Sequence, residues 1–261
     1  MTAGAFVLTL FVGTILLVSL SIELGYRAGR IKPQTTKDKR DESVSLIAST
    51  ILGLLAFILA FTFGIAAGRY DTRLHFVRDE ANAIRTVWSR SDFLPDSDRS
   101  EAKMLIRQYL TARIGAVQVG NPAELQHVLE QSQLIQRRLW STAVRNGRAD
   151  VHSHVMALYI ESLNEMSALH SSRVAVALEL RIPTAVWFFL ASVMALGMGT
   201  VGFQLGSSGS KRAKAVSLLS IAFGLVIALI GMLDRPIPGL SVVPQHPLID
   251  LQSSIEAERN L

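Results

Sequence analysis

The chain has 261 residues, of which 49% are hydrophobic and only 18% are charged, with a net charge of +5. So few charges, together with apolar residues clustered in long runs, exclude an ordinary soluble protein and indicate an integral membrane protein. The absence of cysteine excludes disulfides, thiolate metal sites and cysteine catalysis. Much of the basic charge lies beside the apolar runs, where membrane topology accounts for it, so no nucleic-acid partner is expected.

Two apolar runs predict a first membrane hairpin over residues 1–68. Residues 5–25 form the first span, which we expect to be retained because no cleavage motif follows it. Residues 44–67 form the second span, since they are uncharged over more than the roughly 20 residues that a helix needs to cross the bilayer. The segment between the spans reads as a solvated basic loop, with Arg27, Arg30, Lys32, Lys37, Lys39 and Arg40.

The second span is expected to continue beyond the membrane as one helix. Nothing between Ala67 and Pro95 breaks a helix, so the same rod leaves the membrane at Arg69 and couples the membrane part to the soluble part. The apolar residues of this continuation fall near one stripe: Leu74, Val77, Ala81 and Ile84.

Two stripes of side chains follow the second span. Small residues recur about every fourth position and predict close packing against another helix: Gly53, Ala56, Ala60, Gly64 and Gly68. A bulky stripe lies on the adjacent face and comprises Phe57, Phe61 and Ile65. Either these bulky side chains face lipid or the bundle core, or a ring of them constricts a pore and gates it by dewetting.

Residues 69–182 are polar and long enough to form an extramembrane domain. No window shows the alternation typical of strands, so we expect the domain to be helical. Asn121 with Pro122 predicts the N-cap and first position of one helix, which the Asn-Gly pair at 146–147 is expected to end. Residues 151–180 predict a long helix that leads to the third span.

Residues 183–234 predict a second membrane hairpin with spans at about 184–205 and 215–233. Residues 235–261 form a tail that we expect to pack on the domain. The predicted fold is therefore an all-α integral membrane protein, with four transmembrane helices in two hairpins and a helical extramembrane domain between helices 2 and 3.

The two short links between spans carry nine Lys and Arg residues, including Lys211, Arg212 and Lys214 in the second link. We expect a multi-pass protein of the cell membrane, such as a bacterial inner membrane. The positive-inside rule places the two links on the cytoplasmic side and the helical domain on the outer side. The opposite orientation stays open, because the domain itself carries 15 basic residues, several of them near the spans.

Dense charge follows the second span and recurs after the fourth: Arg69, Asp71, Arg73, Arg78, Glu80, Asn82, Arg85, Asp234 and Arg235. In a ring of symmetric subunits, these arginines would form a vestibule that concentrates anions. The alternative is a salt-bridge network that ties the domain to the membrane part, with Asp234 and Arg235 as partners.

No sequence motif indicates catalysis. His152 and His154 are too close in sequence to share a helical face and have no third ligand nearby, so we expect no metal site there. The sequence has no phosphate-binding loop after a strand, no nucleophile elbow and no metalloprotease helix motif. We therefore expect neither catalytic residues nor a cofactor.

Four segments together resemble a known family: RYDTRLHFVRDEANAIRTVWSRSDFLP after the second span, QYLTAR, RIPTAVW at the third span, and DRPIPG after the fourth. They resemble the bestrophin-like family of mostly bacterial and plant membrane proteins, a domain of unknown function, over nearly the whole chain. The residues that fit the family pattern are Arg69, Tyr70, Asp71, Arg73, Glu80, Asn82, Ala83, Ile84, Leu94, Pro95, Tyr109, Arg113, Arg181, Pro183, Asp234, Arg235, Pro236 and Gly239.

A more distant similarity to true bestrophins implies a homopentameric anion channel whose pore is lined by the second helix of each subunit. True bestrophins clasp calcium with a run of acidic residues, whereas the tail here has only isolated Asp250, Glu256 and Glu258, so calcium gating is not implied. They also hold their helical domain in the cytoplasm, opposite to the side that the charge count favours.

The sequence thus leads to one functional hypothesis and one alternative. The hypothesis is a homo-oligomeric ion channel in the lipid bilayer that conducts inorganic anions passively and is not an enzyme. The alternative is a non-conducting membrane sensor or scaffold whose helical domain binds a protein partner.

Overall fold

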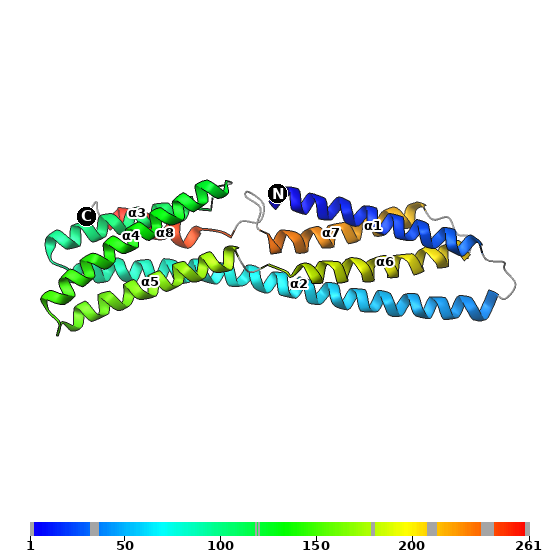
Figure 1. Cartoon of the computed structure of the whole chain (residues 1–261), viewed down its shortest axis with the longest axis horizontal. Coiled ribbons are helices and arrows are strands. Elements are labelled where there is room, and N and C mark those ends of the chain that lie inside the picture. The colour runs from blue at the N-terminus through cyan, green and yellow to red at the C-terminus, as the bar shows by residue number, and fades with distance from the viewer. Residues whose placement is uncertain are drawn as a thin grey trace. The chain divides into compact units, whose positions relative to one another are not determined.

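The structure is a computed structural model, and it describes residues 3–31, 37–117, 119, 121–178, 181–207, 213–235 and 243–258. These residues form eight α-helices and one short 3-10 helix (Figure 1). The helices are α1 (Ala3–Ile31), α2 (Lys37–Arg90), η1 (Ser91–Phe93), α3 (Asp96–Gly115), α4 (Pro122–Ala149), α5 (His154–Leu178), α6 (Thr184–Ser207), α7 (Ala213–Asp234) and α8 (His246–Glu258). Among the described residues, α1, α2, α6 and α7 are long and apolar enough to cross a membrane.

The chain divides into two compact units. The first, here called the membrane unit, comprises Met1–Tyr70 and Arg181–Ile237. The second, the helical unit, comprises Asp71–Leu180 and Pro238–Leu261. Helix α2 contributes its first part to the membrane unit and its last part to the helical unit.

Helix α2 is uninterrupted over 54 residues, as the absence of a breaker before Pro95 predicted. Its last part buries Val77, Ala81 and Ile84, three members of the predicted apolar stripe. The predicted loop between the first two spans is wrong at both ends, because α1 continues to Ile31 and α2 already begins at Lys37. An ion pair one turn apart, Arg27 to Glu23 at 2.7 Å, supports the helical continuation of α1.

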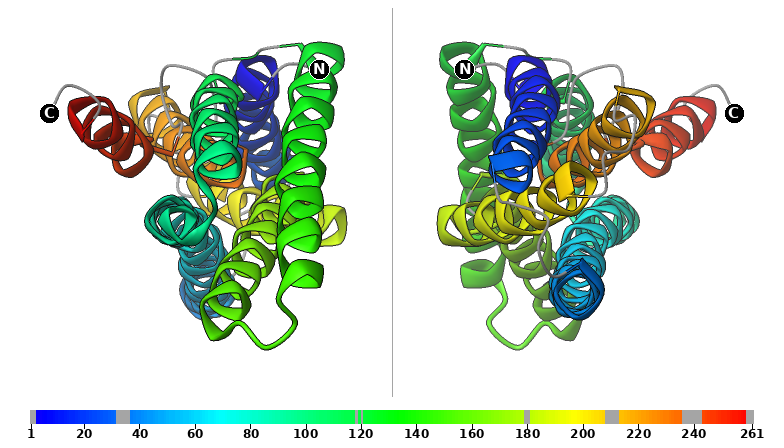
Figure 2. Two further views of the ribbon diagram at one scale, coloured as in Figure 1. Left: turned by 90° about the vertical axis from the view of Figure 1, so that its left-hand side faces the viewer. Right: turned by 90° about the vertical axis from the view of Figure 1, so that its right-hand side faces the viewer.

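The membrane unit has an apolar core to which all four of its helices contribute. Its buried members include Val18 and Ile22 of α1, Leu55 and Leu59 of α2, Leu190 and Met194 of α6, and Ile227 and Ile230 of α7. Viewed from its end, this unit has α1, α6 and α7 grouped together, with α2 at one corner (Figure 2, right). One side of α2 is therefore turned away from the other helices of the unit.

Glycines make the closest helix contact in the membrane unit, between α1 and α6. A Cβ added at Gly25 or Gly29 of α1, or at Gly202 or Gly206 of α6, would lie less than 3.0 Å from a backbone atom of the facing helix. Each pair has the four-residue spacing that lets membrane helices approach closely. We did not predict this contact from the sequence, although both pairs are visible there; our packing stripe was placed only in the second span.

The helical unit confirms one predicted helix boundary and corrects two others. Asn121 caps α4, its side-chain oxygen accepting a hydrogen bond from the Ala123 N–H at 3.0 Å. The Asn-Gly pair at 146–147 does not end this helix, which runs on to Ala149. Asn146 instead donates its side-chain amide to Asp98 at 2.6 Å, and this tertiary contact outweighs the local stop signal. Helix α5 begins at His154, three residues later than predicted.

Helix α8 packs in the helical unit through one apolar face. Leu248, Leu251 and Ile255 are buried, and Gln252 donates a hydrogen bond to the hydroxyl of Thr111 on α3 at 3.4 Å. Near the end of α8, Glu258 accepts a hydrogen bond from the indole of Trp88 on α2 at 2.8 Å. The described part of the C-terminal segment thus belongs to the helical unit.

Candidate functional site

The first candidate site is the exposed face of α2 in the membrane unit. The side chains of Phe57 and Phe61 are 68% and 64% exposed. Their rings stack on each other, with centroids 6.4 Å apart and planes inclined by 15°. The opposite face of α2 carries the buried Leu55 and Leu59, so the two phenylalanines point away from the core of their own chain. Ile65, the third predicted member of this stripe, is half-buried.

The predicted small-residue stripe lies on the same exposed side of α2. Gly53, Gly64 and Gly68 would accept a Cβ with no neighbouring heavy atom within 4 Å, and Ala56 and Ala60 are exposed. Among the described residues, therefore, no other helix packs against this stripe. Their predicted role in packing against a second copy stays a prediction.

In the helical unit, α2 exposes polar residues at helical spacing. Asp71, Arg78, Asn82 and Arg85 are all exposed. Arg78 and Arg85 form no ion pair with the described residues, whereas Asp71 lies 3.4 Å from the His75 imidazole. The face that would line the predicted vestibule thus carries guanidinium groups that no carboxylate of the described chain neutralises.

Among the other members of the predicted charged set, Arg73 is buried in the helical unit, and the rest occupy two separate places. At the end of the membrane unit, the Arg69 guanidinium lies 3.6 Å from the buried carboxylate of Asp234, and that carboxylate also accepts the Ile182 N–H at 2.7 Å. The Arg235 guanidinium lies over the ring of Phe6, 3.8 Å from its centroid. Arg69 and Asp234 thus form an ion pair within the membrane unit. The predicted network between the domain and the membrane part stays a prediction.

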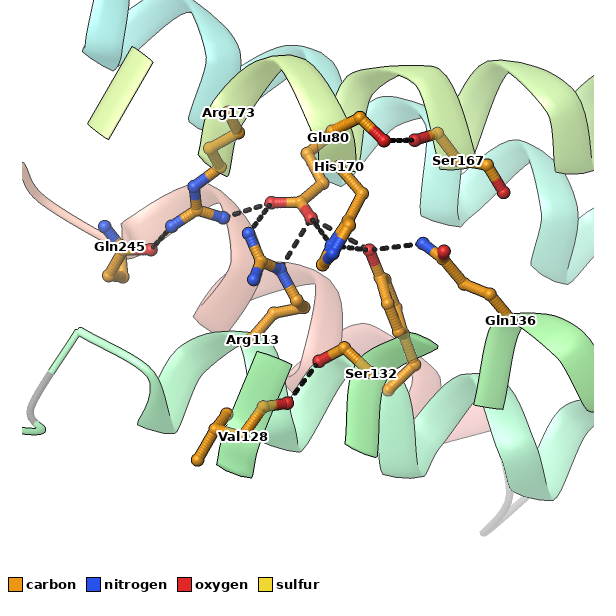
Figure 3. Close-up of polar contacts among 11 residues, drawn as sticks. Glu80, Arg113, Val128, Ser132, Gln136, Ser167, His170, Arg173 and Gln245 are labelled. Carbon is orange, nitrogen blue, oxygen red and sulfur yellow. Dashed lines mark hydrogen bonds and ion pairs between the residues drawn. The ribbon is translucent and has the colours of Figure 1, made fainter. Parts of the chain in front are cut away.

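The second candidate site, the Glu80 cluster, is buried inside the helical unit (Figure 3). The Glu80 carboxylate is fully buried and accepts hydrogen bonds from the guanidinium groups of Arg113, at 2.7 Å from Nε, and of Arg173. The carboxylate also accepts a hydrogen bond from the hydroxyl of Tyr109 at 3.0 Å. Around this centre lie His170, Gln136 and Gln245, so the cluster joins α2, α3, α4, α5 and the residues before α8. We predicted Glu80 as an exposed or interhelical charge; the structure places it at the centre of this buried network.

The hydrogen bonds of the cluster assign the tautomer of His170. Tyr109 has one hydroxyl hydrogen, which it donates to Glu80, and its oxygen accepts from the Gln136 amide at 3.3 Å. Nδ1 of His170 lies 3.0 Å from the same oxygen, so this nitrogen must carry the hydrogen and donate it. His170 therefore carries a hydrogen on Nδ1.

Burial sets the protonation of the surrounding groups. The pKa of His170 is lowered to about 4, mainly by burial and also by the positive charges of Arg113 and Arg173, while the nearby Glu80 carboxylate opposes the shift. Burial also raises the pKa of Tyr109, which keeps its hydroxyl a donor at any ordinary pH. Burial lowers the pKa of Arg173, and the charge of Glu80 opposes this shift. The cluster therefore holds two guanidinium groups, one carboxylate and a neutral histidine.

The neutral state of His170 predicts an acid-sensitive fold. An unfolded histidine has a pKa of about 6.5, so between roughly pH 6.5 and 4 the unfolded chain binds a proton that the folded chain does not. Stability then falls as the pH is lowered through this window, by a total on the order of 3 kcal/mol. We expect His170→Gln to flatten this decline. Unfolding midpoints in detergent at pH 7, 6, 5 and 4.5 measure it, and parallel slopes for wild type and variant would contradict the assignment.

Sequence reasoning missed most of the Glu80 cluster. Tyr109 and Arg113 belonged to the family pattern but were given no role, and His170, Arg173 and Gln245 carried no local signal. These residues lie 27 to 93 positions apart from their partners in sequence, so only the packing of the helices brings them together. Among the described residues, no group of three His, Cys, Asp or Glu side chains is placed to hold a metal ion.

The fold and the motif residues can now be compared with known proteins. A family model for the Bestrophin-like domain matches residues 15–248. The chain belongs to the Bestrophin-like family. The family match confirms the resemblance that the motifs indicated. Since four of its described helices are long and apolar enough to span a bilayer, this Bestrophin-like protein is a multi-pass membrane protein.

Solved structures show the same fold. One is a mutant of a bacterial bestrophin homologue from Klebsiella pneumoniae, 16% identical, with a TM-score of 0.62 over 95% of this chain and 98% of that chain. A second mutant of that homologue is 14% identical, with a TM-score of 0.58 over 98% and 99%. A mutant described as a membrane protein is 16% identical, with a TM-score of 0.55 over 94% and 95%. No curated protein matches the sequence significantly.

Proposed function

We propose that this Bestrophin-like protein is a homo-oligomeric channel that conducts anions passively, with α2 of each subunit lining a central pore. One observation carries the proposal: α2 presents a face of stacked aromatic and small residues that the described part of the chain leaves uncovered. Phe57 and Phe61 would form the hydrophobic constriction, and the neighbouring glycines would let adjacent α2 helices approach closely.

The charges beyond this constriction support anions as the conducted species. Arg78 and Arg85 are exposed on α2 and form no ion pair with the described residues. A ring of such guanidinium groups would raise the local concentration of anions at the pore mouth. Five copies are proposed from the resemblance to true bestrophins. The charge count of the short links supports a cell-membrane orientation with the helical domain outside, and the opposite orientation follows if this chain inserts as true bestrophins do.

Anion flux into liposomes tests the proposal. We expect purified protein to carry chloride, and Phe61→Ala to raise the flux about tenfold or more, because a narrower apolar constriction costs a dehydrated ion more free energy. Phe188→Ala on α6 is the matched control, since this ring is exposed to a similar degree, 71%, and its removal should leave flux unchanged. No flux for several anions, or a monomeric mass for the detergent-solubilised complex, would contradict the channel.

A second candidate function rests on α4 of the helical unit. Leu134 and Trp140 are 53% and 43% exposed, and Arg137 and Arg138 are exposed between them in sequence. Exposed aromatic and arginine side chains are typical of protein-binding surfaces. If liposomes show no flux, this surface makes the non-conducting sensor or scaffold the better proposal.

A further inference from the structure

One end of the membrane unit brings basic and aromatic side chains from three helices together. The Arg235 guanidinium, just beyond the end of α7, lies 3.8 Å from the centroid of the Phe6 ring on α1. The Phe6 ring in turn meets the indole ring of Trp187 on α6 edge-on, with centroids 6.2 Å apart. Each of these residues lies within four positions of the end of an apolar run, so the group sits at the boundary of the hydrocarbon layer.

The charges in this place do not balance within the described residues. The buried carboxylate of Asp234 is engaged by the Arg69 guanidinium at 3.6 Å and by the Ile182 N–H at 2.7 Å. Arg235 forms no ion pair with any described residue. Asp234 thus pairs with Arg69, and no described carboxylate pairs with the positive charge of Arg235.

The two arginines also have N–H groups without a hydrogen-bond acceptor. Nε of Arg235 and Nη1 of Arg69 are buried and have no hydrogen-bond acceptor among the described residues. A buried charged donor without an acceptor is destabilising, because its lost hydration is not replaced. The stacking on Phe6 offsets part of this cost for Arg235, but a π face neutralises no charge. The place therefore suits an additional anion with several acceptor oxygens.

We propose that this end of the membrane unit binds the phosphate group of an anionic membrane phospholipid. The guanidinium of the half-buried Arg235 would contact the phosphate, because a planar guanidinium pairs with phosphate oxygens in a bidentate manner. Phe6 and Trp187 would lie beside the glycerol and upper acyl chains, where aromatic rings are favoured. A free phosphate ion offers the same oxygens but has no apolar part to place against these rings.

Native mass spectrometry of the full chain in detergent tests this, with titration of phosphatidylglycerol and of phosphatidylcholine with the same acyl chains. We expect phosphatidylglycerol to bind more tightly, and Arg235→Gln to weaken its binding about tenfold, the loss of one charged contact. Arg30→Gln is the matched control. The Arg30 guanidinium also lies over an aromatic ring, 5.8 Å from the centroid of Tyr26, but Arg30 is exposed and lies at the other end of α1. Phosphatidylglycerol should therefore bind to Arg30→Gln as tightly as to wild type.

Arg235→Lys is a second test that does not depend on Arg235→Gln folding. It keeps the charge but loses the planar fork, so we expect phosphatidylglycerol to bind severalfold more weakly than to wild type. Wild-type affinity in Arg235→Lys, or equal losses in Arg30→Gln and Arg235→Gln, would overturn the proposal. Displacement of phosphatidylglycerol by millimolar inorganic phosphate would also overturn it, because the site would then belong to a free anion. None of these measurements depends on ion conduction.

Discussion

Gly25→Ala is expected to destabilise the membrane unit by about 1–3 kcal/mol, the range for overpacking a tight contact. The added Cβ would meet the carbonyl of Gly199 and the amide nitrogen of Phe203, both backbone atoms that cannot rotate away. Helices α1 and α6 would therefore have to separate, and the contacts around Ile22 and Met198 would loosen. For a chain of this size the midpoint of thermal unfolding should fall by about 2–12 °C.

Gly13→Ala is the control for this change, because it lies in the same helix with no heavy atom within 4 Å of the added Cβ. Alanine is the better helix former, so stability should stay the same or rise by up to about 1 kcal/mol. Unfolding of both variants in detergent, followed by circular dichroism, makes the comparison. Equal midpoints for the two variants would mean that α1 and α6 do not meet through their glycines.

Glu80→Gln is expected to have the largest effect in the helical unit, about 3–5 kcal/mol. The substitution keeps the shape of the side chain but removes the one charge that Arg113 and Arg173 share. Two buried guanidinium groups would then remain without a carboxylate. The expected result is a lower unfolding midpoint, by about 10 °C, or loss of folded protein on purification.

Two further variants test whether the loss of stability comes from the buried network and not from the loss of any carboxylate on α2. Asp79→Asn removes a carboxylate from the preceding position of α2, but Asp79 is exposed, so the free energy of unfolding should change by no more than about 0.5 kcal/mol. The double variant Glu80→Gln with Arg173→Gln removes one of the stranded charges and should recover part of the loss. A double variant as unstable as the sum of its parts would show that Glu80 and Arg173 act independently.

Much of the fold could be read from local patterns. The lengths of the apolar runs located all four candidate spans, and the absence of a breaker before Pro95 predicted the continuity of α2. Asn121 with Pro122 located the start of α4, because an N-cap is a property of neighbouring residues. The predicted start of the loop after the first span and the predicted end of α4 were wrong. Polar residues in both places stay helical, because their side chains form ion pairs or hydrogen bonds within the fold.

The amino-acid sequence on its own determined that this is an all-helical membrane protein of the Bestrophin-like family, because hydropathy, helix signals and motif spacing are local properties of the chain. Only the tertiary structure decided which glycines make a helix contact and which carboxylate is buried. Gly25 meets α6, whereas Gly64 faces open space, and Glu80 gathers partners from α3 and α5 while Asp71 stays exposed. These outcomes depend on which side of each helix turns toward a neighbour, and neighbours distant in sequence set that orientation.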